Sequence, residues 1–81
     1  MTTLRTAGLP LTDYQRDVLL LAGRGLTSEQ IARRLGSTRA GVDMAAKAAT
    51  DRLGARSRTH AVALAITTGL IDPSEIAEET R

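Results

Sequence analysis

The side chains of this 81-residue sequence that are best suited to chemistry are cations and hydroxyls, which bind anions. Thr27 and Ser28 begin a predicted helix, where hydroxyls and free backbone N–H groups favour a phosphate. Thr38 begins the next predicted helix, and arginines follow both. We therefore expect phosphate contacts from six residues: Thr27, Ser28, Arg34, Thr38, Arg56 and Arg58. The simpler alternative is that the hydroxyls only cap helices and that the arginines form a solvated surface.

Residue combinations typical of catalytic sites are absent from the sequence. It contains no cysteine, which excludes a thiol nucleophile, a thiolate metal site and a disulfide. Its single histidine, His60, stands near the start of a predicted helix, and we interpret it as a surface residue and not as a metal ligand. No nucleophile–base pair or phosphate-binding glycine loop is visible. We therefore expect a protein that is not an enzyme and that needs no cofactor or metal.

Residues 26–53 have the pattern of a helix-turn-helix. Thr27 and Gln30 have the spacing of a capping box, and Gly36 suits the left-handed position that ends a helix. After a very short turn, Thr38 can cap a second, longer helix. The expected buried stripe of that helix repeats at four, three and four residues: Val42, Ala46, Ala49 and Leu53. A short helix, a tight turn and a longer helix form the geometry that lays a helix in the major groove of DNA.

Two more helices are predicted beside this unit. Thr12 and Gln15 form another capping box, which predicts a first helix that runs to about Ala22. Ser57 is the expected cap of a fourth helix, which we expect to end at Gly69.

The sequence divides the chain into three parts. Residues 1–10 have no periodicity and predict a flexible N-terminal arm, residues 11–71 form the predicted domain, and residues 72–81 form an acidic C-terminal tail. In the tail, Asp72 can cap a helix and Pro73 suits its first position. The predicted fold is therefore all-α, with four helices and a possible short fifth helix.

The fourth predicted helix is apolar on two sides. Ala61, Leu64 and Ala65 share one face, whereas Val62 and Ile66 lie on another. A helix that is apolar on two sides needs two partners. One partner can be its own domain, and the other could be a second copy of the chain. We therefore expect a homodimer that forms through Val62 and Ile66.

The net charge of +2 is unevenly distributed. Residues 1–71 carry ten Arg or Lys against five acids, a net +5, whereas residues 72–81 carry one Arg against four acids, a net −3. A basic body favours a polyanionic partner, although a solvated basic surface is an equal alternative on charge alone. No apolar run reaches the roughly 18 residues of a membrane helix, so we expect a cytoplasmic protein without a membrane partner.

Motifs along most of the chain fit one family pattern. They are Leu11-Thr12, Val18-Leu19, Gly25-Leu26-Thr27, Ile31-Ala32-Arg33-Arg34-Leu35-Gly36, Val42, Leu53-Gly54, Ser57-Arg58, Ala61 and Gly69-Leu70-Ile71. With these residues the chain resembles the LuxR/GerE-type DNA-binding domain over about residues 11–71. The resemblance implies a four-helix domain that binds DNA as a dimer, with the third helix in the major groove and the fourth at the dimer contact. It also suggests a small stand-alone member, associated with the nucleoid.

Departures from the family pattern lie in the third helix. Where the family has Thr-Val-Lys-x-His, this chain has Gly41-Val42-Asp43-Met44-Ala45. The usual lysine is therefore an aspartate and the usual histidine an alanine. The basic residue one turn later is kept, as Lys47.

Four residues of this helix are expected to contact bases: Arg39, Asp43, Met44 and Lys47. Arg39 could contact guanine or a phosphate, and Met44 could pack on a thymine methyl group. Asp43 could accept a hydrogen bond from cytosine N4, or it could be a solvated carboxylate that repels phosphate. Arg39 and Met44 could also simply be exposed.

Two hypotheses about function follow from these residues. The first is a transcriptional regulator that binds a near-palindromic site on double-stranded DNA as a homodimer. The alternative is a protein-interaction module of the same fold that binds another regulator, a sigma factor or RNA polymerase. The missing lysine and histidine favour the alternative, whereas the retained arginines oppose it.

Overall fold

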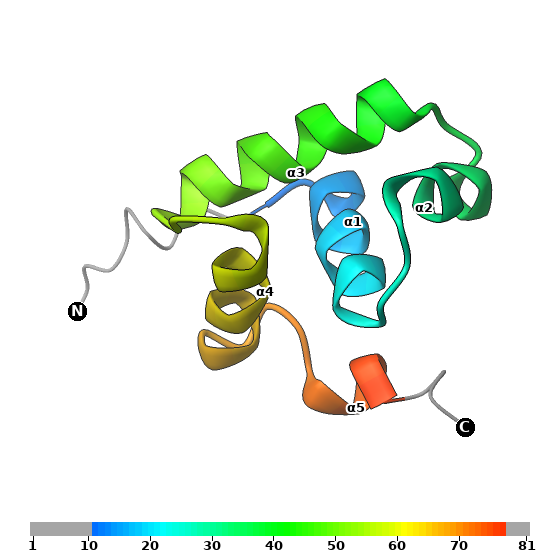
Figure 1. Ribbon diagram of the computed structural model, residues 1–81. Helices are drawn as coiled ribbons and strands as arrows, with labels where there is room; N and C mark the ends of the chain where they lie inside the picture. The colour runs from blue at the N-terminus through cyan, green and yellow to red at the C-terminus, as the bar shows by residue number, and fades with distance from the viewer. Residues whose placement is uncertain (1–10, 78–81) are drawn as a thin grey trace.

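The computed structural model describes residues 11–77, and over this range it is helical with no strand (Figure 1). The helices are α1 (Asp13–Gly23), α2 (Ser28–Leu35), α3 (Arg39–Leu53), α4 (Arg58–Thr67) and α5 (Pro73–Ala77). This order confirms the predicted all-α fold of four helices with a short fifth helix. The N-terminal arm that we expect over residues 1–10, and the end of the acidic tail at residues 78–81, lie outside the described residues.

Capping hydroxyls begin the first four helices. The side chains of Thr12, Thr27, Thr38 and Ser57 each accept a hydrogen bond from the backbone N–H three residues later. In α1 and α2 a glutamine side chain also bonds back to the cap residue, which completes both predicted capping boxes. A cap of this kind stabilises a protein by about 1 kcal/mol. The predicted helix starts are therefore confirmed.

The helix ends agree with the sequence in α2 and α3 but not in α4. Gly36 and Gly54 end α2 and α3 in the left-handed region, with φ of +67° and +68°, where glycine is not strained. Helix α4 ends at Thr67, two residues before the predicted end, and Gly69 has a left-handed φ of +83° just beyond it. The hydroxyls of Thr67 and Thr68 each donate to a carbonyl four residues earlier, at 2.8 Å. Beyond them, the backbone N–H of Leu70 donates to the carbonyl of Ala65 at 2.8 Å, a bond typical of a helix that ends at a left-handed glycine.

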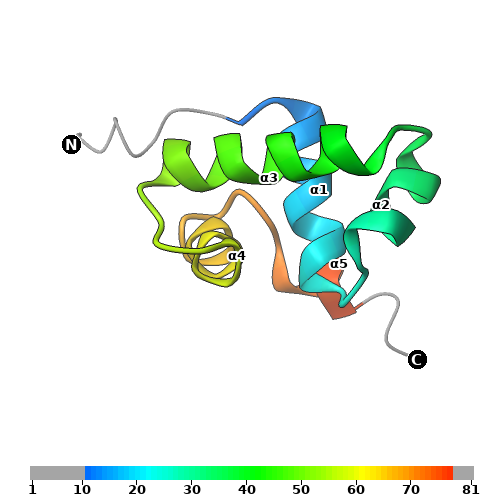
Figure 2. The ribbon, with the colours of Figure 1, turned by 45° about the horizontal axis from the view of Figure 1, so that its top comes forward.

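Helix α1 lies in the middle of the fold. Helix α3 crosses it, with α2 on one side and α4 on the other (Figures 1 and 2). The hydroxyl groups of Tyr14 on α1 and Ser37 in the turn between α2 and α3 are hydrogen-bonded at 2.8 Å. This bond ties the turn of the helix-turn-helix to the central helix.

Two groups of buried side chains form the core, and both include residues of α1 and α3. The group beside α2 comprises Val18, Leu21, Ile31, Ala32, Val42, Ala45 and Ala46. The group beside α4 comprises Leu19, Leu20, Ala49, Leu53, Ala61, Ala65 and Ile71. All four residues of the predicted α3 stripe are buried, so that prediction is confirmed.

The described part of the acidic tail is bound to α1. The guanidinium of Arg16 donates to both carboxylate oxygens of Glu75, at 2.6 and 2.9 Å, and to the carbonyl of Leu70 at 2.8 Å. Arg24 donates to the backbone carbonyl of Glu75 at 2.7 Å. Asp72 accepts a hydrogen bond from the backbone N–H of Ser74 at 2.8 Å, as expected of a helix cap. Helix α5 is therefore anchored to the body of the domain.

The second apolar face of α4 is partly covered within the chain. Gly23 of α1 lies so close that a Cβ there would come within 2.5 Å of Ile76 Cδ1 and 3.2 Å of Val62 Cγ1. Val62 and Ile66 are both half-buried against the core. Residues of α1 and α5 thus cover part of the second apolar face of α4. A homodimer through this face stays a prediction.

We expect the contact between Arg16 and Glu75 to make stability depend on acidity. The hydrogen bond from Arg16 is the main cause that lowers the pKa of Glu75, and the backbone N–H of Asp72 adds to it. A carboxyl group whose pKa is lowered in the folded state stabilises the fold above its unfolded pKa, about 4.3, and this stability is lost as the pH falls through the folded pKa. Glu75→Gln should therefore lower Tm by a few degrees at neutral pH, and the difference from the parent should vanish in strong acid.

Asp17→Asn is the matched control, because it removes a carboxylate that lies 3.9 Å from the same arginine but belongs to α1 and not to α5. Circular dichroism melts from pH 7 to pH 2 would compare the three proteins. Equal Tm values for the parent and Glu75→Gln at neutral pH would show that Glu75 does not anchor α5.

Candidate nucleic-acid interface

The face of α3 opposite its buried stripe is exposed to solvent. Met44 is 72% exposed and is the one large apolar residue with this degree of exposure in the described chain. The side chains of Arg39 and Lys47 are 67% and 79% exposed. Three of the four residues expected to contact bases therefore lie in solvent on one helix.

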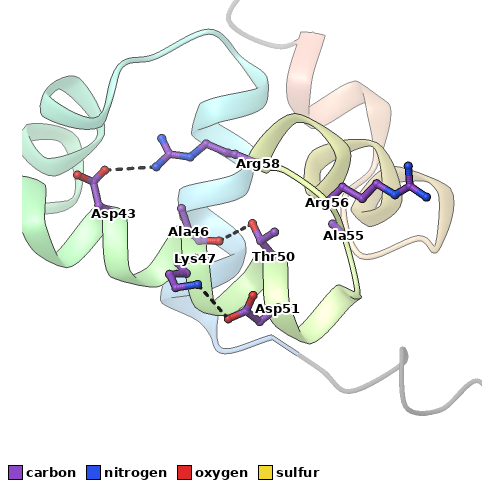
Figure 3. Close-up of a pocket in the computed structure, with 8 residues that line it drawn as sticks. All are labelled: Asp43, Ala46, Lys47, Thr50, Asp51, Ala55, Arg56 and Arg58. Atoms are coloured by element: carbon purple, nitrogen blue, oxygen red, sulfur yellow. Dashed lines mark hydrogen bonds and ion pairs between the residues drawn. The ribbon is translucent and has the colours of Figure 1, made fainter.

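The fourth, Asp43, is held by two other helices. Its Oδ1 atom accepts a hydrogen bond from the Ser28 hydroxyl at 2.7 Å and lies 3.3 Å from Nη2 of Arg58. Nη1 of Arg58 donates to the Ser28 hydroxyl at 3.1 Å. This Ser28–Asp43–Arg58 cluster joins the first residues of α2 and α4 to the second turn of α3. Figure 3 shows the pairing of Asp43 with Arg58.

The cluster keeps Asp43 negatively charged. The hydrogen bond from Ser28 is the main cause that lowers the pKa of Asp43, followed by the hydrogen bond from Arg58. The positive charges of Arg58 and Arg39 act in the same direction, and partial desolvation opposes them. The exposed face of α3 therefore has a fixed negative charge among its cations.

The cations of this face have carboxylate neighbours. Arg39 lies 3.8 Å from Glu29 and 3.7 Å from Asp43, and Lys47 lies 3.6 Å from Asp51. Exposed pairs of this kind contribute only about 0–1 kcal/mol each. These cations can therefore exchange their carboxylate neighbours for another anion at low cost.

The residues expected to contact phosphate fall into separate places on the surface. Arg56 and Arg58 line a shallow hollow with Lys47 and Asp43, between α3 and the start of α4 (Figure 3). Thr27 and Ser28 line a neighbouring hollow. Arg34 instead lines a hollow of α2. Within the hollow of Figure 3, Arg58 points toward Asp43, whereas the Arg56 side chain points away from it. The structure thus places Arg58 and Ser28 beside α3 and leaves Arg34 apart.

Two hydroxyl groups and the histidine of this region already form hydrogen bonds within the protein. The side chains of Thr27 and Thr38 each accept one hydrogen bond as helix caps. What each hydroxyl can still offer a ligand is its hydrogen and its second lone pair. Gly41 stands where the family pattern has a threonine. A Cβ there would lie 3.2 Å from the Thr38 hydroxyl and 3.4 Å from the Tyr14 hydroxyl. His60 accepts a hydrogen bond from the backbone N–H of Arg56 at 3.0 Å through its Nδ1 atom.

Sequence reasoning placed Asp43 on this face but missed two other acidic residues, Glu29 and Asp51. The spacing of four residues between Lys47 and Asp51 is a helical ion-pair spacing, and it could have revealed that pair. Glu29 pairs with Arg39 from another helix. Its contact depends on how the helices pack, and no local signal predicts it.

Residues 11–77 contain neither a candidate metal centre nor a membrane-spanning helix. No group of three or more His, Cys, Asp or Glu side chains is placed to hold a metal ion there. None of the helices in the described part of the chain is long and apolar enough to cross a membrane.

Comparison with known protein families supports the resemblance seen in the sequence. Residues 9–65 match the GerE family model, which describes bacterial regulatory proteins of the luxR family. Searches of curated proteins and of solved structures found no match. The matched residues include α1, α2, α3 and most of α4, and they make up more than half of the chain. The chain therefore belongs to the luxR family of bacterial regulatory proteins, a family of DNA-binding regulators.

Proposed function

We propose that this protein is a transcriptional regulator that binds specific sites on double-stranded DNA as a homodimer. The main supporting observation is that α3 buries one stripe and exposes Arg39, Met44 and Lys47 from the same helix. In a helix-turn-helix protein the second helix of the motif enters the major groove and contacts base edges. Helix α3 has that position in the motif.

The exposed residues of α3 have the chemistry to contact base pairs. Arginine and lysine side chains donate to guanine O6 and N7, and an apolar side chain packs on the thymine methyl group. We assign the first role to Arg39 and Lys47 and the second to Met44. Asp43 lies on the same helix, but its hydrogen-bond partners are already within the protein.

Residues around α3 can position the helix on the DNA backbone. The first turn of α2, with Thr27 and Ser28, offers an N-terminal helix end that favours phosphate. Arg56 and Arg58 lie beside Lys47 at the edge of α3. We propose that these four residues, together with Thr38 and Arg34, contact phosphates. Such contacts fix orientation and do not specify sequence.

One observation favours the alternative of a protein-interaction module. Glu29, Asp43 and Asp51 place three carboxylates beside the cations of the α3 face. A face of mixed charge around an exposed methionine suits a protein partner, such as another regulator, a sigma factor or RNA polymerase. Duplex DNA, in contrast, favours a face of positive charge. The same carboxylates predict modest DNA affinity if the first proposal is correct.

We expect duplex binding to depend strongly on salt. If the dimer neutralises about six phosphates, its affinity should fall roughly 10³-fold between 50 and 200 mM salt. Arg34→Ala and Arg56→Ala should each weaken binding to preferred and scrambled duplexes alike and reduce the salt slope by about one per protomer. Fluorescence anisotropy with labelled duplexes would measure both quantities.

Met44→Ala is the uncharged comparison, and it should change sequence preference but leave the salt slope unchanged. A flat salt response of the parent protein, or no duplex binding at low salt, would favour the protein-interaction module.

We expect the dimer to depend on Ile66. Both residues pack against the core, and Val62 also lies beside Gly23 of α1, so we place the charge at Ile66 and check the fold by circular dichroism. Ile66→Glu should give a folded monomer that binds DNA weakly, because half-sites about one helical turn apart need both copies. Thr67→Glu places the same charge at the neighbouring exposed residue and should leave the dimer intact. Analytical ultracentrifugation with and without duplex would test this. A parent protein that stays monomeric at high concentration and on DNA would remove the proposed dimer.

A further inference from the structure

The carboxylate of Asp43 lies between the two side chains, Ser28 and Arg58, to which the proposed function assigns phosphate. We propose that Asp43 is an internal competitor of DNA phosphate at Ser28 and Arg58, so that duplex DNA binds there only by displacing it. This inference rests on the proposed function, because it concerns the same face of the molecule.

Hydrogen bonding within the cluster supports competition. The Ser28 hydroxyl has one hydrogen to donate, and it donates that hydrogen to Asp43 at 2.7 Å. Both terminal nitrogens of Arg58 are engaged, one with Asp43 at 3.3 Å and one with Ser28 at 3.1 Å. A phosphate oxygen bound to the Ser28 hydroxyl needs this same hydrogen. Arg58 has five N–H donors, of which two are used in these bonds, so at Arg58 a phosphate competes with Asp43 for the positive charge. Ser28 cannot donate its hydroxyl hydrogen to Asp43 and to a phosphate at the same time.

Charge supports the same conclusion. The second carboxylate oxygen of Asp43 lies 3.7 Å from Nε of Arg39, so one carboxylate reduces the positive charge at two cations of the face. The pKa of Asp43 is lowered by its hydrogen bonds to Ser28 and Arg58. The competitor is therefore ionised at neutral pH and stays so under mild acidification.

Partial exposure makes the exchange feasible. The side chains of Asp43 and Arg58 are 46% and 39% exposed. Water reaches both groups, so separating them does not leave a charge buried in the protein. Arg58 can turn from the carboxylate to a phosphate, after which Asp43 is hydrated by solvent.

The exchange has a consequence for counterions. In the free protein Asp43 already neutralises Arg58, so the gain from an Arg58–phosphate contact is offset by a newly unpaired carboxylate. Without the carboxylate, each Arg58–phosphate contact should release about one more counterion, with a slope near 0.9 per phosphate. The competitor should therefore weaken binding to every duplex by the same factor and reduce the dependence on salt.

The test is Asp43→Asn in the full chain, titrated with a preferred and a scrambled duplex between 25 and 200 mM salt. Relief of an exposed ion pair corresponds to an affinity increase of up to about fivefold per protomer. We expect this gain for both duplexes, with a steeper salt slope. In the double variant with Arg58→Ala, the gain and the steeper slope should both become smaller, and what remains comes from the contacts of Asp43 with Ser28 and Arg39.

Asp51→Asn is the matched control, because it removes a carboxylate from the same face that pairs with Lys47 and not with Arg58. Its gain in affinity should persist when Arg58 is alanine. If the gain of Asp43→Asn is equally large when Arg58 is alanine, its effect is general charge repulsion and the competition is overturned. A loss of affinity confined to the preferred duplex would instead make Asp43 a base contact, which also overturns it.

Two further outcomes separate this inference from the proposed function. Duplex binding by Asp43→Asn but not by the parent would support competition by Asp43. The same result would contradict the proposal that the parent chain binds DNA. Absence of binding by both proteins would overturn both ideas. Should Asp43→Asn fail to fold, the parent alone provides the test. The ¹³C NMR signal of the Asp43 carboxyl group should move when duplex saturates the protein, and an unchanged signal would overturn the inference.

Discussion

Close packing of α3 on α1 is the interaction on which the rest of this structure depends. Both buried groups of the core contain residues of these two helices. Three of the buried α3 residues are alanines and one is a valine, besides Leu53 at the end, so the side chains that α3 places against α1 are mostly small. With one stripe buried in this way, Arg39, Met44 and Lys47 must face solvent. The exposed face that supports DNA binding is thus a direct result of core packing.

Ion pairing modifies what this exposed face can do. A row of unpaired cations would bind any polyanion, but Arg39, Lys47 and Arg58 each lie within 4 Å of a carboxylate. The Ser28–Asp43–Arg58 cluster also connects three helices, so the binding face and the relative positions of α2, α3 and α4 depend on the same contacts. Family membership alone does not imply this arrangement, because the family pattern has a lysine where this chain has Asp43.

Local features of the structure could be predicted from the sequence, whereas contacts between helices could not. The hydroxyl caps at Thr12, Thr27, Thr38 and Ser57 depend on residues three apart, and the α3 stripe depends on helical periodicity, so both were predicted correctly. The partner of Glu75 is 59 residues away at Arg16, and that of Asp43 is 15 residues away at Arg58. No spacing rule relates such residues, because the packing of the core brings them together. The sequence therefore predicted which side chains of α3 are exposed, Arg39, Met44 and Lys47 among them, but not the contacts from other helices, such as those of Asp43 with Ser28 and Arg58.

The central claim is that the exposed face of α3 binds duplex DNA. Its most direct test is a titration of ¹⁵N-labelled protein with duplex at low salt, followed by the backbone amide signals of each residue. We predict the largest changes in α3 from Arg39 to Lys47 and in the first turns of α2 and α4, with little change in α5. Changes confined to α4 and α5 with α3 unaffected, or no change at any residue, would contradict the account.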